Sequence, residues 1–479
     1  MLFQSLQFIL FFFPVFILNL VFANFFNSQD LRRILLVISS AIFYMSWNVS
    51  LFFLLAASIF INFYIGNWIA ASSSHKTRKL LLLIAIAVQL VILALFKYAN
   101  FGIESALVFL SAVGLAPSSP IFLDIILPLG ISFYTFQGMS YVIDVYREKY
   151  RPYQSLLDFF LYISFFVQLI AGPIVRADFF RKNLVKADFS VSVAQVSSGL
   201  FLFVMGVFKK SVLADNAAKI ADLVFLQADD VPSLMVLLGI YCFAFQIYFD
   251  FSGYTDMARG LARMLGFELP INFSAPYLAR GLRDFWKRWH ISLSTWLRDY
   301  LYISLGGSRV STVRTYINLM LTMLLGGLWH GASFNFVIWG GIHGLFLSIE
   351  HAFSLKTGPN STSNWVKVLT IFLTFHVVCF AWIFFRAPDF DTTLVILNKL
   401  VEMQGYLDVS ALQLFKPQNW GFGLILPAVV VFAIEGRFNS NAINLEIRHV
   451  FWRAAFFTSL LFLILLTSGG ANEFVYFQF

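Results

Sequence analysis

The sequence predicts an all-α, polytopic integral membrane protein, and two observations support this fold class. Hydrophobic residues make up 59% of the 479 residues and charged residues only 12%, which is about half the charged share of a soluble domain. Apolar runs recur along the chain, for example over residues 8–22, 80–95 and 455–466 with their flanks. At about 20 residues per span plus loops, we expect about 11 to 13 helices or helix pieces. The run-like pattern does not alternate as β-barrel strands do.

Charge and cysteine content exclude several other classes of protein. The two cysteines, Cys242 and Cys379, lie in apolar runs and indicate neither a disulfide framework nor a metal cluster. The net charge of +8 is spread over short loops, which favours contact with an anionic membrane leaflet over nucleic-acid binding. The first apolar segment has no basic region before it, so we expect a retained helix.

The basic loops predict a topology with one internal contradiction. Residues 30–33, 72–79 and 145–151 carry Lys and Arg and are expected in the cytoplasm, with the N-terminus outside. The basic loop 175–186 would then lie outside if residues 156–171 spanned the membrane. We therefore expect residues 156–171 to be a re-entrant or tilted piece that is buried in protein.

A polar segment in the centre of the chain follows a helical period without being a membrane span. The segment "GLRDFWKRWHISLSTWLRDYLYISLGG" (281–307) has its apolar residues on one helical face, which predicts an amphipathic helix at the cytoplasmic interface. His290 falls at the edge of the apolar stripe. From spacing alone it either faces a cavity or, as we favour, only straddles the interface. An adjacent polar ridge comprises Arg283, Lys287, Ser294 and Arg298.

The next helix predicts a histidine in the interior of the bilayer. The apolar stretch from Tyr316 to Trp329 has 14 residues, or about 21 Å of helix, against a hydrocarbon core of about 30 Å. His330 follows this stretch, and Gly327 and Gly331 beside it permit close backbone approach. An ionisable residue at that depth favours a functional role slightly over helix packing.

Three further polar groups lie in apolar surroundings. His343, in "WGGIHG", favours a structural role, and so does His376. The cluster "YFDFSGYTDMARG" (248–260) places Asp250 and Asp256 near membrane depth, where acids need a partner or water. Asp250 is expected to line a wet cavity or to orient a histidine, whereas Asp256 has a potential partner in Arg259 on the same helix. Neither a phosphate-binding loop nor a zinc-ligand spacing is present.

The longest motifs resemble the membrane-bound O-acyltransferase family, in the branch that contains the membrane subunit of alginate O-acetyltransferase. They are "RDFWKRWHISLSTWLRDYLYISLGGS" and "LLGGLWHGASFNFVIWGGIHG". Further matches lie at residues 96–101, 128–147, 169–176 and 248–260 and in the ending "EFVYFQF". The resemblance covers nearly the whole chain and is weakest over 387–442, where 387–420 is expected to be a polar loop. With no repeat or low-complexity linker, we expect one domain (1–479) with its catalytic core at about residues 128–350.

The resemblance implies helices around a central tunnel and assigns chemistry to two histidines. His330 matches the family's defining "WHG" histidine, and His290 matches the "RWH" histidine, so both are expected to be catalytic. His330 would act as a general base or would carry the acyl group. The residues expected to line the tunnel or to bind substrate are Trp289, Trp296, Trp329, Asp250, Ser252 and Tyr254.

The resemblance also implies transfer of an acyl group, acetyl in this branch, from a cytoplasmic thioester donor to an extracellular polysaccharide. Acetyl-CoA is the expected donor, and no tightly bound cofactor is expected. The expected partners are a periplasmic acetyltransferase or polysaccharide-modification complex and membrane lipids, in a bacterial inner (cytoplasmic) membrane. The donor's phosphates are expected on basic side chains at the cytoplasmic mouth: Arg283, Lys287, Arg288 and Arg298.

Other functions remain open from the sequence. D-alanyl or other acyl transfer to a cell-envelope polymer is the nearest alternative within acyltransferases. A transporter for polysaccharide would also use intramembrane acids and histidines, but it would function without His330 as a base. A scaffold would depend on the basic amphipathic surface and would tolerate changes of both motif histidines.

Overall fold

The computed structural model describes residues 1–115, 122–169, 172–185, 191–354, 363–402 and 450–467. In these residues the regular elements are all helices, which confirms the all-α prediction. Seven of the described helices are long and apolar enough to cross a membrane, so the chain is a multi-pass membrane protein. They are Leu6–Phe25, Val49–Ala71, His75–Ala112, Val193–Leu226, Ser233–Met264, Phe334–Phe353 and Asn364–Arg386.

The chain divides into two compact units. The first comprises residues 1–200 and 258–270, and the second comprises residues 201–257 and 271–479. Helices α10 and α12 run through the boundaries between them. The expected single domain and its catalytic core stay predictions, and both motif histidines belong to the second unit.

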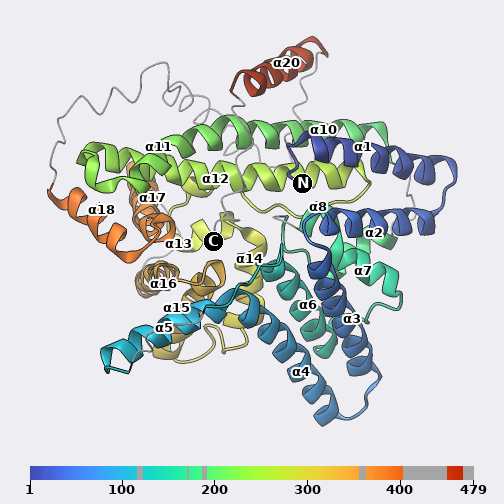
Figure 1. Cartoon of the computed structure of the whole chain (residues 1–479), viewed down its shortest axis with the longest axis horizontal. Coiled ribbons are helices and arrows are strands. Elements are labelled where there is room, and N and C mark those ends of the chain that lie inside the picture. Colours follow the sequence, from blue (N-terminus) through green and yellow to red (C-terminus); the bar gives the residue numbers. More distant parts are fainter. Residues whose placement is uncertain (116–121, 170–171, 186–190, 355–362, 403–449, 468–479) are drawn as a thin grey trace. The chain divides into compact units, whose positions relative to one another are not determined.

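Three neighbouring helices of the first unit begin at polar N-caps. The side chains of Ser28, Asn48 and Ser74 accept backbone N–H groups at the starts of α2, α3 and α4, which satisfies donors that a helix start leaves open. Helices α3, α4 and α6 pack on one another (Figure 1). The helices of this unit are α1 (Leu6–Leu20), α2 (Gln29–Met45), α3 (Val49–Ala71), α4 (His75–Leu93), α5 (Ala99–Ala112), α6 (Ile131–Tyr146), α7 (Leu156–Ser164), α8 (Phe166–Leu169), α9 (Ala177–Val185) and the first part of α10 (Val193–Phe208).

The segment expected to be re-entrant is broken into two short helices. Helix α7 has 9 residues and α8 has 4, and the chain leaves helical geometry at Phe165. The hydroxyl of Ser40 accepts the N–H of Phe166 at 3.1 Å, so the break does not leave this donor unpaired. The side chains from Leu161 to Leu169 are buried. An irregular piece buried in protein is therefore confirmed.

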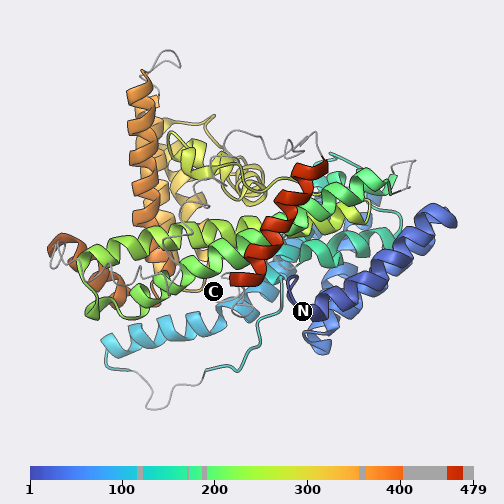
Figure 2. The same ribbon diagram turned by 90° about the horizontal axis from the view of Figure 1, so that it is seen from above.

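The second unit contains the motif histidines. Helix α11 runs alongside α12, and α17 crosses their direction (Figures 1 and 2). The elements are a π-helical turn (Lys209–Ala214), α11 (Asp215–Leu226), α12 (Ser233–Met264), α13 (Leu282–Arg288), α14 (Ile291–Trp296), a second π-helical turn (Leu297–Tyr302), α15 (Thr312–His330), α16 (Phe334–Ser354), α17 (Asn364–Arg386), α18 (Phe390–Glu402) and α20 (Val450–Thr467).

Helices α15 and α16 form a hairpin that depends on glycine. A Cβ atom on Gly327 would collide with the backbone of Phe336, and one on Gly340 would collide with the backbone of Met323. A Cβ on Gly331 would enter the Phe336 ring. The glycines next to the motif histidine therefore bring two backbones together, as the sequence predicted.

Two sequence predictions about helix lengths were wrong. Helix α15 has 19 residues, not 14, because it begins at Thr312, after the N-cap Ser311. Its length of about 28 Å nearly matches the hydrocarbon core, so length does not place His330 in the bilayer interior. The expected polar loop after Ala387 is helical over α18, and the part of it from residue 403 onward lies outside the described residues.

Candidate active site

The expected amphipathic helix over 281–307 is interrupted at His290. This residue has φ 41° and ψ 55°, a left-handed conformation between α13 and α14. The backbone carbonyl of Asn272 accepts the N–H of Ile291 at 2.9 Å, and its side-chain oxygen accepts the N–H of Ser292 at 3.0 Å. A loop distant in sequence thus takes the hydrogen bonds that a continuous helix would have used, and the prediction of one helix was wrong.

The break turns the His290 ring inward. The side chain is 0% exposed, so the expected position at the edge of the apolar stripe was wrong. Its Nδ1 lies 3.3 Å from the side-chain oxygen of Asn272. This amide oxygen has no hydrogen to donate, and it also accepts the backbone N–H of Ser292. Nδ1 therefore donates, and Nε2 is left as the basic nitrogen. Burial lowers the pKa of His290 to about 3, so the ring is neutral at pH 7.

His330 lies against the same group of aromatic rings. It is the last residue of α15 and is 4% exposed. Its ring centroid lies 5.0 Å from Trp329, 5.0 Å from Trp339 and 5.4 Å from Phe385. Trp329 also contacts His290 edge-on, with centroids 6.2 Å apart. The two motif histidines therefore share one buried site.

The third histidine of this region joins the same site. His343, on α16, is 0% exposed. Its ring lies 4.8 Å from Trp339 and 5.2 Å from Trp286, measured between centroids. We call His290, Trp329, His330, Trp339 and His343 the aromatic site. The sequence interpretation of His343 as structural missed this proximity, although Trp339 precedes it at the helical spacing of four residues.

Trp289 and Trp296, which were expected to line the tunnel or bind substrate, pack on rings outside the aromatic site. Trp289 is 0% exposed and contacts Trp382 and Phe273, each at 5.1 Å between ring centroids. Trp296 packs on Tyr300 at 5.2 Å. Trp382 and Phe385 on α17 were not predicted, because nothing in their spacing connects them with the motifs.

The acids of α12 pair with lysines that the sequence analysis missed. Asp250 lies 2.8 Å from the Nζ of Lys210, which also contacts Asp215 at 2.7 Å. Asp256 lies 2.7 Å from the Nζ of Lys209, and its expected pairing with Arg259 stays a prediction. Asp250 thus compensates a buried cation, and its expected role in lining a cavity or orienting a histidine stays a prediction.

The remaining expected residues of α12 face the protein interior. Ser252 and Tyr254 are 2% and 0% exposed. Between Asp250 and Ser252, Phe251 contacts the His290 ring edge-on at 4.7 Å between centroids. Helix α12 therefore forms one wall behind His290. A continuous tunnel past these residues stays a prediction.

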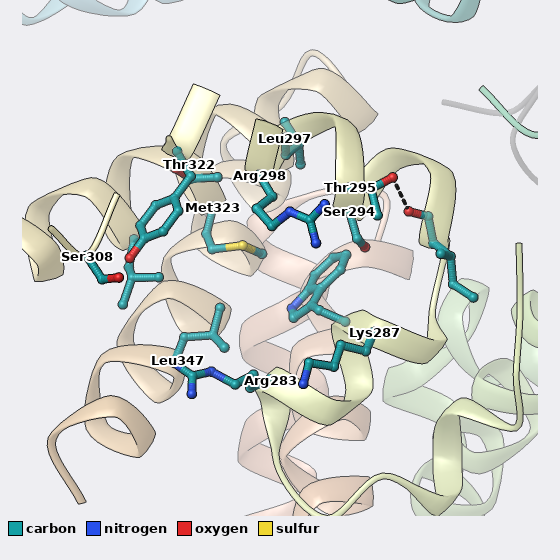
Figure 3. Close-up of a pocket in the computed structure, with 14 residues that line it drawn as sticks. Arg283, Lys287, Ser294, Thr295, Leu297, Arg298, Ser308, Thr322, Met323 and Leu347 are labelled. Carbon is teal, nitrogen blue, oxygen red and sulfur yellow. Dashed lines mark hydrogen bonds between the residues drawn. The ribbon is translucent and has the colours of Figure 1, made fainter. Parts of the chain in front are cut away.

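The polar ridge predicted on 281–307 lines a cavity of about 490 Å³. Figure 3 shows Arg283, Lys287 and Arg298 around this cavity, with Ser294 beside Arg298. The apolar part of its wall includes Trp286, Leu319, Met323 and Leu347. We call this cavity the basic pocket.

Arg288, the fourth basic residue expected at the mouth, has a different neighbour. Its Nε donates to Asp284 at 2.8 Å, and its guanidinium also bonds the carbonyl of Ser274 at 3.4 Å. It is not among the residues that line the basic pocket. Three of the four expected cations therefore lie together, and Arg288 instead ties α13 to the loop before it.

The geometry suits group transfer by histidine. An imidazole in its unprotonated form retains a nitrogen that can accept a proton, and the aromatic rings around these histidines bury them away from solvent. Three cations beside an apolar wall suit a ligand with an anionic end and an apolar arm. Trp286 belongs to the wall of the basic pocket and also contacts His343 of the aromatic site.

Comparisons with known proteins agree with this chemistry. The model of the membrane-bound O-acyltransferase family matches residues 41–387. The chain is 42% identical over 394 residues to a probable alginate O-acetylase of Pseudomonas aeruginosa, covering 81% of this chain and 72% of the relative. It is 37% identical over 432 residues to a peptidoglycan O-acetyltransferase of Helicobacter pylori, covering 85% and 80%.

A more distant relative is named for the transfer of a different acyl group. The chain is 29% identical over 277 residues to a teichoic acid D-alanyltransferase of Bacillus subtilis, covering 55% of this chain and 69% of the relative. The family match spans most of the chain and includes the aromatic site and the basic pocket. This protein belongs to the membrane-bound O-acyltransferase family and is an O-acyltransferase.

Proposed function

We propose that the protein passes an acetyl group from a cytoplasmic thioester donor, acetyl-CoA, across the membrane for O-acetylation of an extracellular polysaccharide. The observation that carries the proposal is the placement of His330 in a buried aromatic site, with the basic pocket on the same unit. The relatives named as alginate O-acetylase and peptidoglycan O-acetyltransferase support acetyl as the group and a cell-envelope polymer as its destination.

His330 is the proposed general base. Its unprotonated ring nitrogen removes the proton of an acceptor hydroxyl as that oxygen attacks the thioester carbonyl. The carbon–sulfur bond then breaks, and the leaving thiolate takes the proton from the imidazolium. If His330 instead carries the acetyl group, its nitrogen attacks the carbonyl and the carbon–sulfur bond breaks, which releases the thiolate. The acceptor hydroxyl then attacks the acetyl-imidazolium, the carbon–nitrogen bond breaks to restore the neutral ring, and the hydroxyl proton goes to the thiolate. The surrounding rings exclude water, which limits hydrolysis of the thioester.

The basic pocket is the proposed site for the donor's phosphates. Arg283, Lys287 and Arg298 are exposed and line one cavity. Guanidinium and ammonium groups bind phosphate by charge-assisted hydrogen bonds. The apolar wall at Trp286 and Met323 suits the uncharged arm that carries the thioester. No tightly bound cofactor is part of this proposal.

We infer that the protein lies in the bacterial inner membrane with the basic pocket at the cytoplasm. The basic loops support this orientation. A periplasmic acetyltransferase or a polysaccharide-modification complex is the proposed recipient of the acetyl group, and lipids surround the exposed apolar helices. Cysteines placed at residues 283 and 298 test the orientation: they are expected to react with a membrane-impermeant thiol reagent only from the cytoplasmic side. Labelling from outside intact cells contradicts it.

The function itself is tested by the chemistry of the secreted polymer. Deletion of the gene is expected to remove O-acetyl groups, and the intact gene on a plasmid restores them. Labelled acetate and labelled D-alanine distinguish the two acyl groups, because only the transferred one enters the polymer. Loss of polymer export with unchanged acetylation would favour the transporter or scaffold function.

Removing the cations of the basic pocket is expected to weaken use of the donor. Arg283→Gln and Arg298→Gln should each raise the KM for acetyl-CoA by about three- to tenfold, since each removes a charge-assisted bond to phosphate. The KM is measured in inside-out membrane vesicles. Arg288→Gln is the matched control: its guanidinium pairs with Asp284 outside the pocket, so its KM should stay unchanged. An equal effect of all three changes contradicts the assignment.

A further inference from the structure

Three rings connect the basic pocket with His330. Trp286 lines the pocket and lies 5.2 Å from His343. His343 lies 4.8 Å from Trp339, and Trp339 lies 5.0 Å from His330, all between ring centroids. Successive rings are thus in contact distance, and each of the three intermediate rings carries a polar nitrogen.

These intermediate nitrogens have no hydrogen-bond partner among the described residues. This holds for both ring nitrogens of His343 and for the indole Nε1 of Trp286 and of Trp339, and all four atoms are buried. By contrast, His376 on α17 uses both of its nitrogens: Nδ1 donates to the carbonyl of Phe372, and Nε2 accepts from Tyr241, each at 2.8 Å.

Such a cluster is unfavourable for the fold by itself. A buried polar group without a partner destabilises a protein, and an apolar group of the same shape removes that penalty. Phenylalanine would fill the space of His343 between two tryptophans without burying a polar nitrogen. A polar ring here therefore points to a ligand that supplies the missing hydrogen bonds.

We propose that His343, Trp286 and Trp339 form a hydrogen-bonding subsite for carbonyl oxygens of the acyl donor's uncharged arm, between the basic pocket and His330. The subsite offers two indole N–H donors, one imidazole N–H and one acceptor nitrogen. This excess of donors matches amide and thioester carbonyl groups. His343 is a positioning residue: it holds the arm, while His330 reacts. The subsite rests on the proposed function, because it assumes an acylated donor.

The decisive comparison is between two replacements of His343. His343→Phe keeps a flat ring but removes the nitrogens, and it is expected to lower acetyl transfer from acetyl-CoA in membrane vesicles by about tenfold or more. The thermal midpoint of unfolding in detergent should stay equal or rise. His343→Gln keeps a donor and an acceptor, and it is expected to retain transfer within about threefold of the wild type.

His376→Leu is the matched control on a partnered histidine. It should lower the thermal midpoint, because it removes the hydrogen bonds of the ring to the Tyr241 hydroxyl and the Phe372 carbonyl, and it should leave the rate of transfer per folded protein unchanged. If the His343→Phe protein does not accumulate in the membrane, Trp286→Phe tests the subsite in its place. This variant removes one indole N–H and should raise the KM for acetyl-CoA. Wild-type rates in His343→Phe and Trp286→Phe overturn the subsite. If the wild-type protein transfers no acetyl group from acetyl-CoA in the vesicles, that result contradicts the proposed function and not the subsite.

Discussion

Replacement of His330 by glutamine is expected to abolish acetylation of the polymer while the protein reaches the membrane at its normal level. A glutamine amide keeps hydrogen-bonding capacity but cannot accept a proton near neutral pH. Loss of a general base or nucleophile lowers the rate by about two orders of magnitude or more. The measurement is the acetyl content of the secreted polymer, normalised to membrane protein, and His330→Ala should give the same result.

His343→Gln provides the contrast within the same aromatic site. It is expected to keep substantial activity, because hydrogen bonding is the role that we propose for His343. Both variants lose an imidazole in buried, aromatic surroundings, so a difference between them reports chemistry and not packing. Near-normal acetylation with His330→Gln would make His330 a packing residue and would return the transporter and scaffold functions to consideration.

Replacement of Lys210 by methionine is expected to cause the largest loss of stability. Lys210 is 2% exposed and lies between the carboxylates of Asp250 and Asp215. Without its ammonium group, two buried acids face each other, and breaking such a pair from one side costs about 3–5 kcal/mol. The measurements are the amount of protein in the membrane and the thermal midpoint of unfolding in detergent.

Two further variants identify the cause. Lys209→Met breaks the pair with Asp256, which is more exposed at 15% against 1% for Asp250, so its loss should be smaller. The double change Lys210→Met with Asp250→Leu should recover part of the stability, because it removes one of the uncompensated acids. Asp250→Asn alone should be milder than Lys210→Met, since Lys210 keeps Asp215. Equal stability of Lys210→Met and the wild type contradicts the pairing.

The fold class and several local features of the site could be predicted from the sequence alone. Apolar runs are decisive because every span must bury about 20 residues in hydrocarbon. The ridge of Arg283, Lys287 and Arg298 followed from helical spacing, and these residues do line one cavity. The α7–α8 segment was found through the contradiction among basic loops. The spans and the ridge depend on neighbours within a few turns, and the basic loops are counted along the chain, so a single sequence displays all of these signals.

Features that depend on residues distant in the chain became visible only in the three-dimensional structure. Asn272 breaks the expected helix and turns His290 inward. Lys210 partners Asp250 across 40 positions, and the tight α15–α16 hairpin places His343 near His330. The hydrogen bonds and charge pairs that a buried polar group must find can come from any part of the chain. The sequence pattern therefore identified the polar residues that lie in apolar surroundings. Which of these residues contact one another was visible only from the packing of the helices.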